Sequence, residues 1–475
     1  MTKFWSHIAA LILIIHVLFT NAFIENIQYF QILKRDTNTT NTTSAVTTNE
    51  TLLCNGSADL CDLRYNQVTY PGTHNSASYN LKFDCVTSAK SCLETVTPCA
   101  KEYTQCNTYY KIHCEAQTSI CKRWNPNYLH WTCDILDNVC KSTNAWCIVW
   151  LIGCAEASKL CNSWASTCQS VVPDWMVACL WENNAGFPVL RQLNDGIRLL
   201  NFEMCLKNDN KTVEFCHGDG IYLASGLELD PVFSDIKDFM DKNPYEIISL
   251  EFGHINDQGS TYYTISHEIQ SHLEKYFVNS TTGHSQMITL PPASSTNETA
   301  WPTLRQMIEN DQRIVIWFAE LYDSLGNDVK PWIHRLNNYY MPSFSYTPDV
   351  FTPQQLNASF TQHCNNATAL MAADKQLLGY NKWETIDDTV GYVPTGIEIA
   401  VHTNTIPNNI CLKDLAADVN YDLLMYFVDT CKGKFPYFFR IRLDYYPQSY
   451  LFQAVNKMNE YNILRAKNNT NFPIL

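Results

Sequence analysis

Two runs of regularly spaced cysteines constrain the fold of this chain more than any other feature. Six cysteines stand at positions 85, 92, 99, 106, 114 and 121, and six more at 133, 140, 147, 154, 161 and 168. All but one of the steps within the two runs are seven residues. Seven residues bring an α-helix back to nearly the same face, with a drift of about 20°. Neighbouring cysteines on such a helix lie roughly 10 Å apart, too far to bond each other. The spacing therefore predicts two helices that face each other.

A turn between the two runs predicts how they pair. Asn125-Pro126-Asn127 favours a chain reversal, and Pro98 should kink the first helix. An antiparallel hairpin then gives a ladder of disulfides: Cys121 with Cys133, Cys114 with Cys140, Cys106 with Cys147, Cys99 with Cys154, Cys92 with Cys161, and Cys85 with Cys168. A disulfide-rich loop with another connectivity stays open, because spacing alone does not fix pairing. A zinc array is disfavoured, since no CxxC pair is present.

The amino terminus predicts export from the cell. One lysine precedes an apolar run that is too short for a comfortable membrane span, and Thr20-Asn21-Ala22 suits signal peptidase. No later stretch predicts a transmembrane anchor, and the polar C-terminus lacks a lipid-anchor tail. We expect a secreted glycoprotein whose 20 cysteines are mostly oxidised. Its glycosylation sequons lie at Asn38, Asn41, Asn49, Asn55, Asn210, Asn279, Asn297, Asn357, Asn366 and Asn468.

The acidic charge balance excludes some partners. The 475-residue chain has a net charge of −14. Proteins that bind nucleic acid obtain most of their affinity from a basic face, so this balance argues against such a partner. It also argues against simple electrostatic docking on an anionic lipid surface.

Outside the cysteine runs, strand-like and helix-like segments alternate. The expected strands are 67–75, 197–204, 212–218, 245–252, 313–320, 375–383 and 438–446. Near-continuous apolar strands that alternate with amphipathic helices indicate a parallel sheet. The sequence thus predicts an α/β fold, a TIM-type (β/α)8 barrel of regular or distorted form, with the disulfide-laddered helical hairpin inserted after the first strand. The expected divisions are a signal peptide (1–22), a glycosylated leader (23–64), the first barrel strand (65–84), the cysteine-rich insert (85–180), the rest of the barrel (181–465) and a tail (466–475).

Polar residues gather where these strands end. In such barrels the catalytic groups lie at the C-terminal ends of the strands. Reading only those ends gives His74, Asn75, Asn201, Glu203, His217, Glu251 and Asp444. Each could be a satisfied structural group on its own. Together, two histidines and several oxygen ligands are expected to meet at one mouth.

The local sequences around these residues resemble a known family. GTHNSAS (72–78), GIRLLNFEM (196–204), FCHG (215–218) and NPYEIISLEF (243–252) are similar, in order and spacing, to the catalytic half of phosphatidylinositol-specific phospholipases C. The stretch 436–459 resembles the last strand and helix of secreted phospholipase-C-like phosphodiesterases, whereas 255–430 matches only loosely.

The resemblance implies roles for individual residues. His74 and His217 match the two catalytic histidines. Asp444 lies at the end of the barrel where an aspartate of the family's bacterial branch supports the first histidine. The alternative is that Asp444 is only a hydrogen-bond partner at the barrel mouth. Asn75, Asn201, Glu203 and Glu251 match the calcium ligands of the metal-dependent branch, which usually has glutamate where this chain has Asn201. Affinity for Ca²⁺ falls with ligand charge, so weak binding or another divalent ion is an alternative.

The expected function is a secreted phosphoric diester hydrolase that cleaves a phospholipid head group of the phosphatidylinositol type, in transient contact with a membrane surface. His217 is expected to protonate the leaving oxygen while His74 takes up the proton of the nucleophile. The alternatives are a metal-dependent phosphodiesterase on another phospholipid, like sphingomyelinase D or glycerophosphodiesterases, and a catalytically weak barrel that serves as a binding scaffold. Cys205 and Cys216 flank the turn between the second and third strands, and a disulfide there would clamp Glu203 and His217.

Overall fold

The structure is a computed structural model, and part of the chain is described. The described residues are 52–86, 88–90, 93, 162–163, 172, 174–207, 211–218, 223–255, 261–289, 301–335, 361, 384–386, 411–413, 416, 420–431 and 438–468. They belong to the compact unit Leu52–Leu475. The signal peptide and most of the cysteine ladder lie outside the described residues, although Cys85 is disulfide-bonded.

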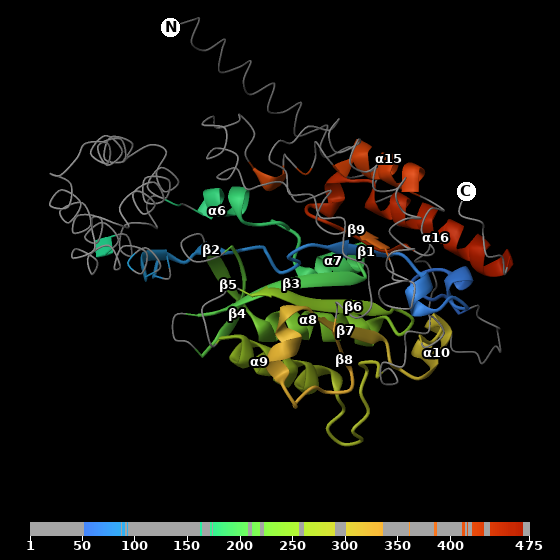
Figure 1. Cartoon of the computed structure of the whole chain (residues 1–475), viewed down its shortest axis with the longest axis horizontal. Helices are drawn as coiled ribbons and strands as arrows, with labels where there is room; N and C mark the ends of the chain where they lie inside the picture. The colour runs from blue at the N-terminus through green and yellow to red at the C-terminus, as the bar shows by residue number, and fades with distance from the viewer. Residues whose placement is uncertain are drawn as a thin grey trace, which may run out of the picture. The chain divides into compact units, whose positions relative to one another are not determined.

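A parallel sheet forms the centre of the fold (Figure 1). Its strands are β1 (Tyr70–Thr73), β3 (Leu199–Leu206), β6 (Ile248–Ile255), β7 (Ile314–Phe318), β8 (Ile333–Arg335), β9 (Glu384–Ile386) and β10 (Phe438–Leu443). They pair side by side in the order β9-β10-β1-β3-β6-β7-β8, and every one of these pairs is parallel. This order is that of a barrel, and the expected α/β fold is confirmed. Within the described residues the sheet does not close between β8 and β9.

An antiparallel extension continues from the C-terminal end of β3. The strands β4 (Val213–His217), β5 (Ala224–Glu228) and β2 (Lys82–Phe83) follow one another there, and each of the three pairs is antiparallel. The segment 212–218, expected as the third barrel strand, is therefore a strand of a hairpin instead. A parallel crossover needs about a dozen residues or more, and the link between β3 and β4 is shorter than that.

Helices pack around the sheet and follow the strands along the chain. They are α6 (Asp174–Leu180), α7 (Val189–Asp195), α8 (Leu229–Lys242), α9 (Thr261–Phe277), α10 (Leu304–Glu309), α15 (Asp422–Cys431) and α16 (Leu451–Asn468), with short 3₁₀ turns at Ala58–Leu60, Tyr65–Gln67, Glu320–Leu325 and Tyr446–Gln448. Helices α15 and α16 lie side by side, and α16 also contacts β10 and β1 (Figure 1). Among the described helices, none has the length and apolar character that a bilayer span requires.

The main hydrophobic core lies between the strands and these helices. It includes Phe202, Phe252 and Phe318 from three neighbouring strands, and Phe233 from α8. All four side chains are fully buried. Because side chains alternate along β10, Ile441 and Leu443 join this core, while Arg440 and Arg442 face the other side of the sheet.

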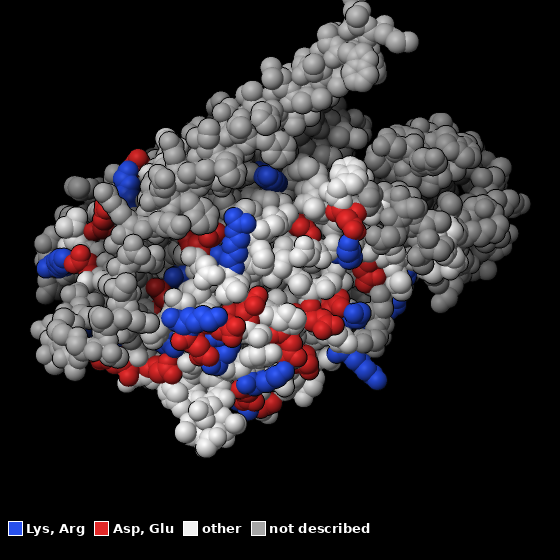
Figure 2. All heavy atoms as spheres, turned by 180° about the vertical axis from the view of Figure 1, so that it is seen from behind, with Lys and Arg blue, Asp and Glu red and all other residues white. Residues whose placement is uncertain are grey.

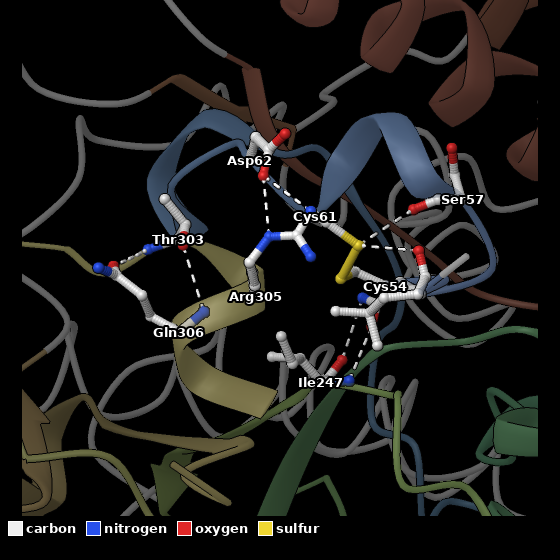
Figure 3. Close-up of a disulfide and its surroundings, with 10 residues drawn as sticks. Cys54, Ser57, Cys61, Asp62, Ile247, Thr303, Arg305 and Gln306 are labelled. Carbon is white, nitrogen blue, oxygen red and sulfur yellow. Dashed lines mark hydrogen bonds and ion pairs between the residues drawn. A yellow bond between two sulfur atoms is a disulfide. The ribbon is translucent and has the colours of Figure 1, made fainter. Parts of the chain in front are cut away.

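Three disulfides join described residues. Cys54–Cys61 closes a short loop ahead of β1, beside the Arg305–Asp62 ion pair and the capping pair Thr303–Gln306 (Figure 3). Cys179–Cys411 ties the end of α6 to a segment 232 residues further on. Cys205–Cys216 links β3 to β4, as the sequence analysis expected.

The charged side chains on one face are of mixed sign. Figure 2 shows lysine and arginine interspersed with aspartate and glutamate over the described part of that face. Among the described residues, several exposed charges form surface ion pairs, such as Lys275 with Asp230. The described part of this face thus mixes both signs of charge.

Candidate active site

His74 and Asp444 meet where two neighbouring strands end. β1 and β10 are paired in register, Thr73 opposite Leu443, so the next residue of each strand lies at the same level. The His74 backbone N–H donates to the carbonyl of Leu443 at 3.1 Å. The two side chains then lie 3.0 Å apart between His74 Nδ1 and Asp444 Oδ1, and both are buried. With Nδ1–H donating to the carboxylate, Nε2 is the ring nitrogen whose protonation can change.

His217 approaches the same place from the antiparallel extension. It is the last residue of β4, directly after the disulfide-bonded Cys216. Its Nδ1 bonds the carbonyl oxygen of Trp181, so Nε2 is again the nitrogen that can exchange a proton. The rings of His74 and His217 have centroids 6.5 Å apart and stand nearly perpendicular.

Asn75 links the first strand to the carboxylates expected on β3 and β6. Its φ of 41° is left-handed, a conformation that asparagine tolerates better than most residues. Its backbone N–H donates to Asn201 Oδ1 at 3.1 Å, and its side-chain amide donates to Glu203 Oε2 at 3.1 Å. Asn201 Nδ2 in turn donates to Glu251 Oε1 at 3.4 Å. The structure thus brings the seven expected residues together: hydrogen bonds join Asn75 to Asn201 and Glu203, Asn201 to Glu251, and His74 to Asp444, and the His217 ring lies beside that of His74.

Glu251, however, is already neutralised by two arginines. Arg440 bonds Glu251 Oε2, and Arg442 Nη1 donates to Glu251 Oε1 at 2.8 Å. These three side chains are almost completely buried. Arg440 and Arg442 were missed in the sequence analysis. The alternation Arg440-Ile441-Arg442-Leu443-Asp444 was the signal that places three charged residues on one face of the strand.

These contacts do not fit the four-ligand calcium site that the family resemblance implies. A divalent ion at Glu251 would have to displace a buried guanidinium, which would leave an uncompensated buried charge. Two of the four expected ligands are Asn75, whose Oδ1 is buried without a hydrogen-bond partner, and Glu203, which has a carboxylate. Calcium prefers six to eight oxygen ligands, so these two residues do not form a calcium site by themselves. The calcium site stays a prediction from the sequence.

A loop that was not predicted from the sequence holds the His74–Asn75 segment in place. It comprises residues 181–184. Asn184 Nδ2 donates to the backbone carbonyl of His74 at 2.8 Å and to that of Asn75 at 3.1 Å. Asn183 Oδ1 accepts from the side chain of Asn75 at 3.3 Å. The same loop supplies the Trp181 carbonyl that orients His217. It follows α6 directly, next to the Cys179–Cys411 disulfide.

Two of the expected glycosylation sequons can be judged from the described side chains. Asn55 is half-buried, and its amide exchanges two hydrogen bonds with the backbone of Ile247. Asn279 is exposed, and its Oδ1 accepts from the backbone N–H groups of Thr281 and Thr282. Asn279 therefore presents its amide nitrogen to solvent more openly than Asn55 does.

Comparison with known proteins supports the family resemblance. The PI-PLC X family model matches residues 175–381, a range that contains three of the four motifs. An uncharacterized secreted protein of Arthroderma benhamiae is 26% identical over 285 residues, which cover 58% of this chain and 56% of that protein. The chain thus spans little more than half the length of this curated relative. The extracellular location expected from the sequence is confirmed by this secreted relative and is consistent with the disulfides.

Solved structures of phosphatidylinositol-specific phospholipases C are also similar. The enzyme of Listeria monocytogenes is 14% identical, with a TM-score of 0.37, over 84% of this chain and 95% of that one. The enzyme of Staphylococcus aureus is 12% identical, with a TM-score of 0.33, over 57% of this chain and 82% of that one.

Proposed function

Because residues 175–381 match the PI-PLC X family, we propose that this secreted chain is a phosphoric diester hydrolase that releases the head group of a phosphatidylinositol-type phospholipid. The observation that carries the proposal is the pair of histidines. His74 and His217 are each held through Nδ1 by an acceptor of the protein, and their rings lie 6.5 Å apart. Oxygens of one phosphoryl group can reach two ring nitrogens at this separation, since each hydrogen bond spans roughly 2.8 Å.

The two histidines have complementary partners. His74 bonds a buried carboxylate, which stabilises the imidazolium that forms when the ring takes up a proton. His217 bonds a neutral carbonyl, which favours neither charge state as strongly. His74 is therefore the better base and His217 the better acid.

In the proposed reaction the 2-hydroxyl of the inositol attacks phosphorus and gives its proton to His74 Nε2. The bond from phosphorus to the diacylglycerol oxygen breaks, and the His217 imidazolium gives that oxygen a proton. One phosphorus–oxygen bond forms and one breaks, so the products are a cyclic inositol phosphate and diacylglycerol. When water then opens the cyclic ester, the two proton transfers run in the opposite direction: His217 accepts a proton from the water and His74 returns one to the inositol oxygen.

The test is head-group release from phosphatidylinositol vesicles by the purified full chain, in calcium and in chelator. His217→Ala should lower the rate by about 100- to 10,000-fold, the usual contribution of a positioned acid. His284→Ala is the matched control, because His284 is an exposed histidine paired with Asp311 outside the site. An H217A protein that folds normally and keeps the wild-type rate would rule out the assignment.

The same assay separates the other substrates. Release from sphingomyelin or from glycerophosphodiesters, without release from phosphatidylinositol, would favour a phosphodiesterase for lipids without an inositol hydroxyl. No release from any of them would favour the scaffold function. In either case the phosphatidylinositol proposal would be wrong.

A further inference from the structure

His74 and Asp444 both lie directly beyond the strands that carry them. β1 ends at Thr73, and β10 ends at Leu443. The backbone N–H of His74 still donates to Leu443, but the carbonyls of His74 and Asp444 accept from side chains outside the sheet. The backbone from which the two side chains project therefore depends on segments other than the strands.

Two buried asparagines provide these contacts. Asn184 Nδ2 donates to the carbonyl of His74 at 2.8 Å, and Asn420 Nδ2 donates to that of Asp444 at 2.9 Å. Both asparagines are fully buried. Water does not replace a donor at a buried carbonyl, so the loss of either amide is costly and each one holds its carbonyl in one position.

The loop 181–184, which carries Asn184, also bonds the chain directly after Asp444. The backbone N–H of Tyr445 donates to the carbonyl of Asn183 at 3.0 Å. Tyr445 has a left-handed φ of 46°, so the chain leaves the strand direction at this residue. One loop thus bonds the ends of both β1 and β10.

The two segments that carry the asparagines are joined to each other. Cys179 lies at the end of α6, just before the loop, and its disulfide partner Cys411 precedes Asn420 in the chain. The disulfide therefore connects the support of His74 to the support of Asp444. One apolar cluster also joins the two segments, with Leu412, Ala416, Tyr445, Ala185 and Phe187.

We propose that Asn184 and Asn420 are positioning residues for the base, and that the Cys179–Cys411 disulfide holds their two segments together. The inference rests on the proposed function, because it assigns a role in the proton uptake by His74. Both asparagines act through the backbone of His74 and Asp444. A general base works only within hydrogen-bond reach of the proton, so a small shift of His74 slows the reaction without weakening the binding of the lipid.

The first experiment is Asn184→Ala in the full chain, measured by head-group release from phosphatidylinositol vesicles. The substitution removes two hydrogen bonds, to the carbonyls of His74 and Asn75. A misplacement of about 1 Å at the reacting groups can lower the rate by about 100-fold. We expect a loss of about this size in kcat, with KM nearly unchanged.

Asn459→Ala is the matched control. Asn459 is also a buried asparagine that makes two hydrogen bonds to backbone, with the N–H of Thr69 at 2.8 Å and its carbonyl at 2.9 Å. Thr69 precedes β1, at the end of the strand opposite to His74. N459A should lose thermal stability as N184A does, but keep kcat near that of the wild type. Equal losses of kcat in the two variants, or a folded N184A with the wild-type rate, would overturn the proposal.

A second measurement does not depend on activity. It is nuclear magnetic resonance of the full chain with 15N-labelled histidine. The Nδ1–H that His74 donates to Asp444 is buried, so it should exchange slowly with water and give a signal of its own. This signal should persist in N459A and be shifted or lost in N184A. An unchanged signal in a folded N184A speaks against the positioning role.

Two further variants test the rest of the support. Asn420→Ala should lower kcat in the same way as N184A, and it decides the question if N184A does not fold by circular dichroism. Joint replacement of Cys179 and Cys411 by alanine keeps both asparagines and should also lower kcat. Removal of the Cys54–Cys61 disulfide, ahead of β1, should not. If neither N420A nor the C179A/C411A variant loses activity, the support is not needed and the proposal is wrong.

These outcomes separate the inference from the proposed function. Loss of activity in H217A beside unaffected N184A and N420A would leave the proposed function standing and remove only this inference. If the wild type cleaves no phosphatidylinositol, the proposed function fails, and the histidine signal alone tests whether Asn184 positions His74 against Asp444.

Discussion

Replacing Asp444 by asparagine tests the proposed role of His74 as the base. The carboxylate is buried and bonds His74 Nδ1 at 3.0 Å. Asparagine keeps the shape but removes the charge. Its amide can also donate to Nδ1, which would move the ring proton to Nε2 and block proton uptake there.

The size of the effect follows from the distance. A unit charge pair at 3.0 Å with an effective dielectric constant of about 20 contributes about 5.5 kcal/mol. A hydrogen bond to a charged group contributes about 3 kcal/mol at the upper end of its usual range. Between these limits we expect kcat to fall by about 1,000-fold. KM should change little, because Asp444 acts through His74 rather than on the substrate.

The assay is steady-state head-group release from phosphatidylinositol vesicles, with circular dichroism to show that the fold is kept. Asp195→Asn is the matched control, because Asp195 is also an aspartate that accepts one hydrogen bond, from Tyr446 at 2.6 Å, outside the site. If D444N folds and keeps kcat within about tenfold of the wild type, the reasoning that Asp444 sets the state of the base is refuted.

Three other predictions concern stability and processing. Burial lowers the pKa of His334 to about 4 in the folded protein, below the value of 6.5 for an unperturbed histidine. The unfolded chain therefore binds a proton at a higher pH than the folded chain does, and about 3 kcal/mol of folding stability is lost as pH falls from 6.5 through 4. His334→Gln should flatten that loss in thermal unfolding at a series of pH values, and an unchanged slope would contradict it. Removing Cys205–Cys216, which closes a loop of 11 residues, should cost about 3 kcal/mol in denaturant unfolding, and a loss well under 1 kcal/mol would speak against a stabilising clamp. Asn279→Gln should remove one glycan mass from the secreted protein, and an unchanged mass would show that the site is unused.

The sequence predicted the candidate site better than it predicted the strands that carry it. Seven polar residues were expected at strand ends, and the structure brings them together. Residues of different strands meet here because β1, β3, β6 and β10 are parallel neighbours in register, so that residues at one level of the sheet lie side by side. His217 was placed correctly, although its strand runs antiparallel.

The direction of β4 could have been found in the sequence. Six residues separate Leu206 from Val213, too few for the crossover that a parallel neighbour requires. Apolar periodicity identifies a strand but carries no information on its direction. The length of the connection does, and it predicts a hairpin here.

The ladder of disulfides remains a prediction, since its cysteines lie outside the described residues apart from Cys85. The pairing of Cys179 with Cys411 shows how little spacing says about distant cysteines. These residues are separated by 232 positions, and no local pattern relates them.

The sequence by itself determined the alternation of strands and helices and the extracellular location, because each of these depends on local order along the chain. Only the tertiary structure decided what Glu251 binds. The family pattern implied a metal ligand, whereas the fold places two arginines against it from a strand 189 residues away. A carboxylate binds whichever cation lies within reach in the folded barrel, and no local pattern in the chain records that distance.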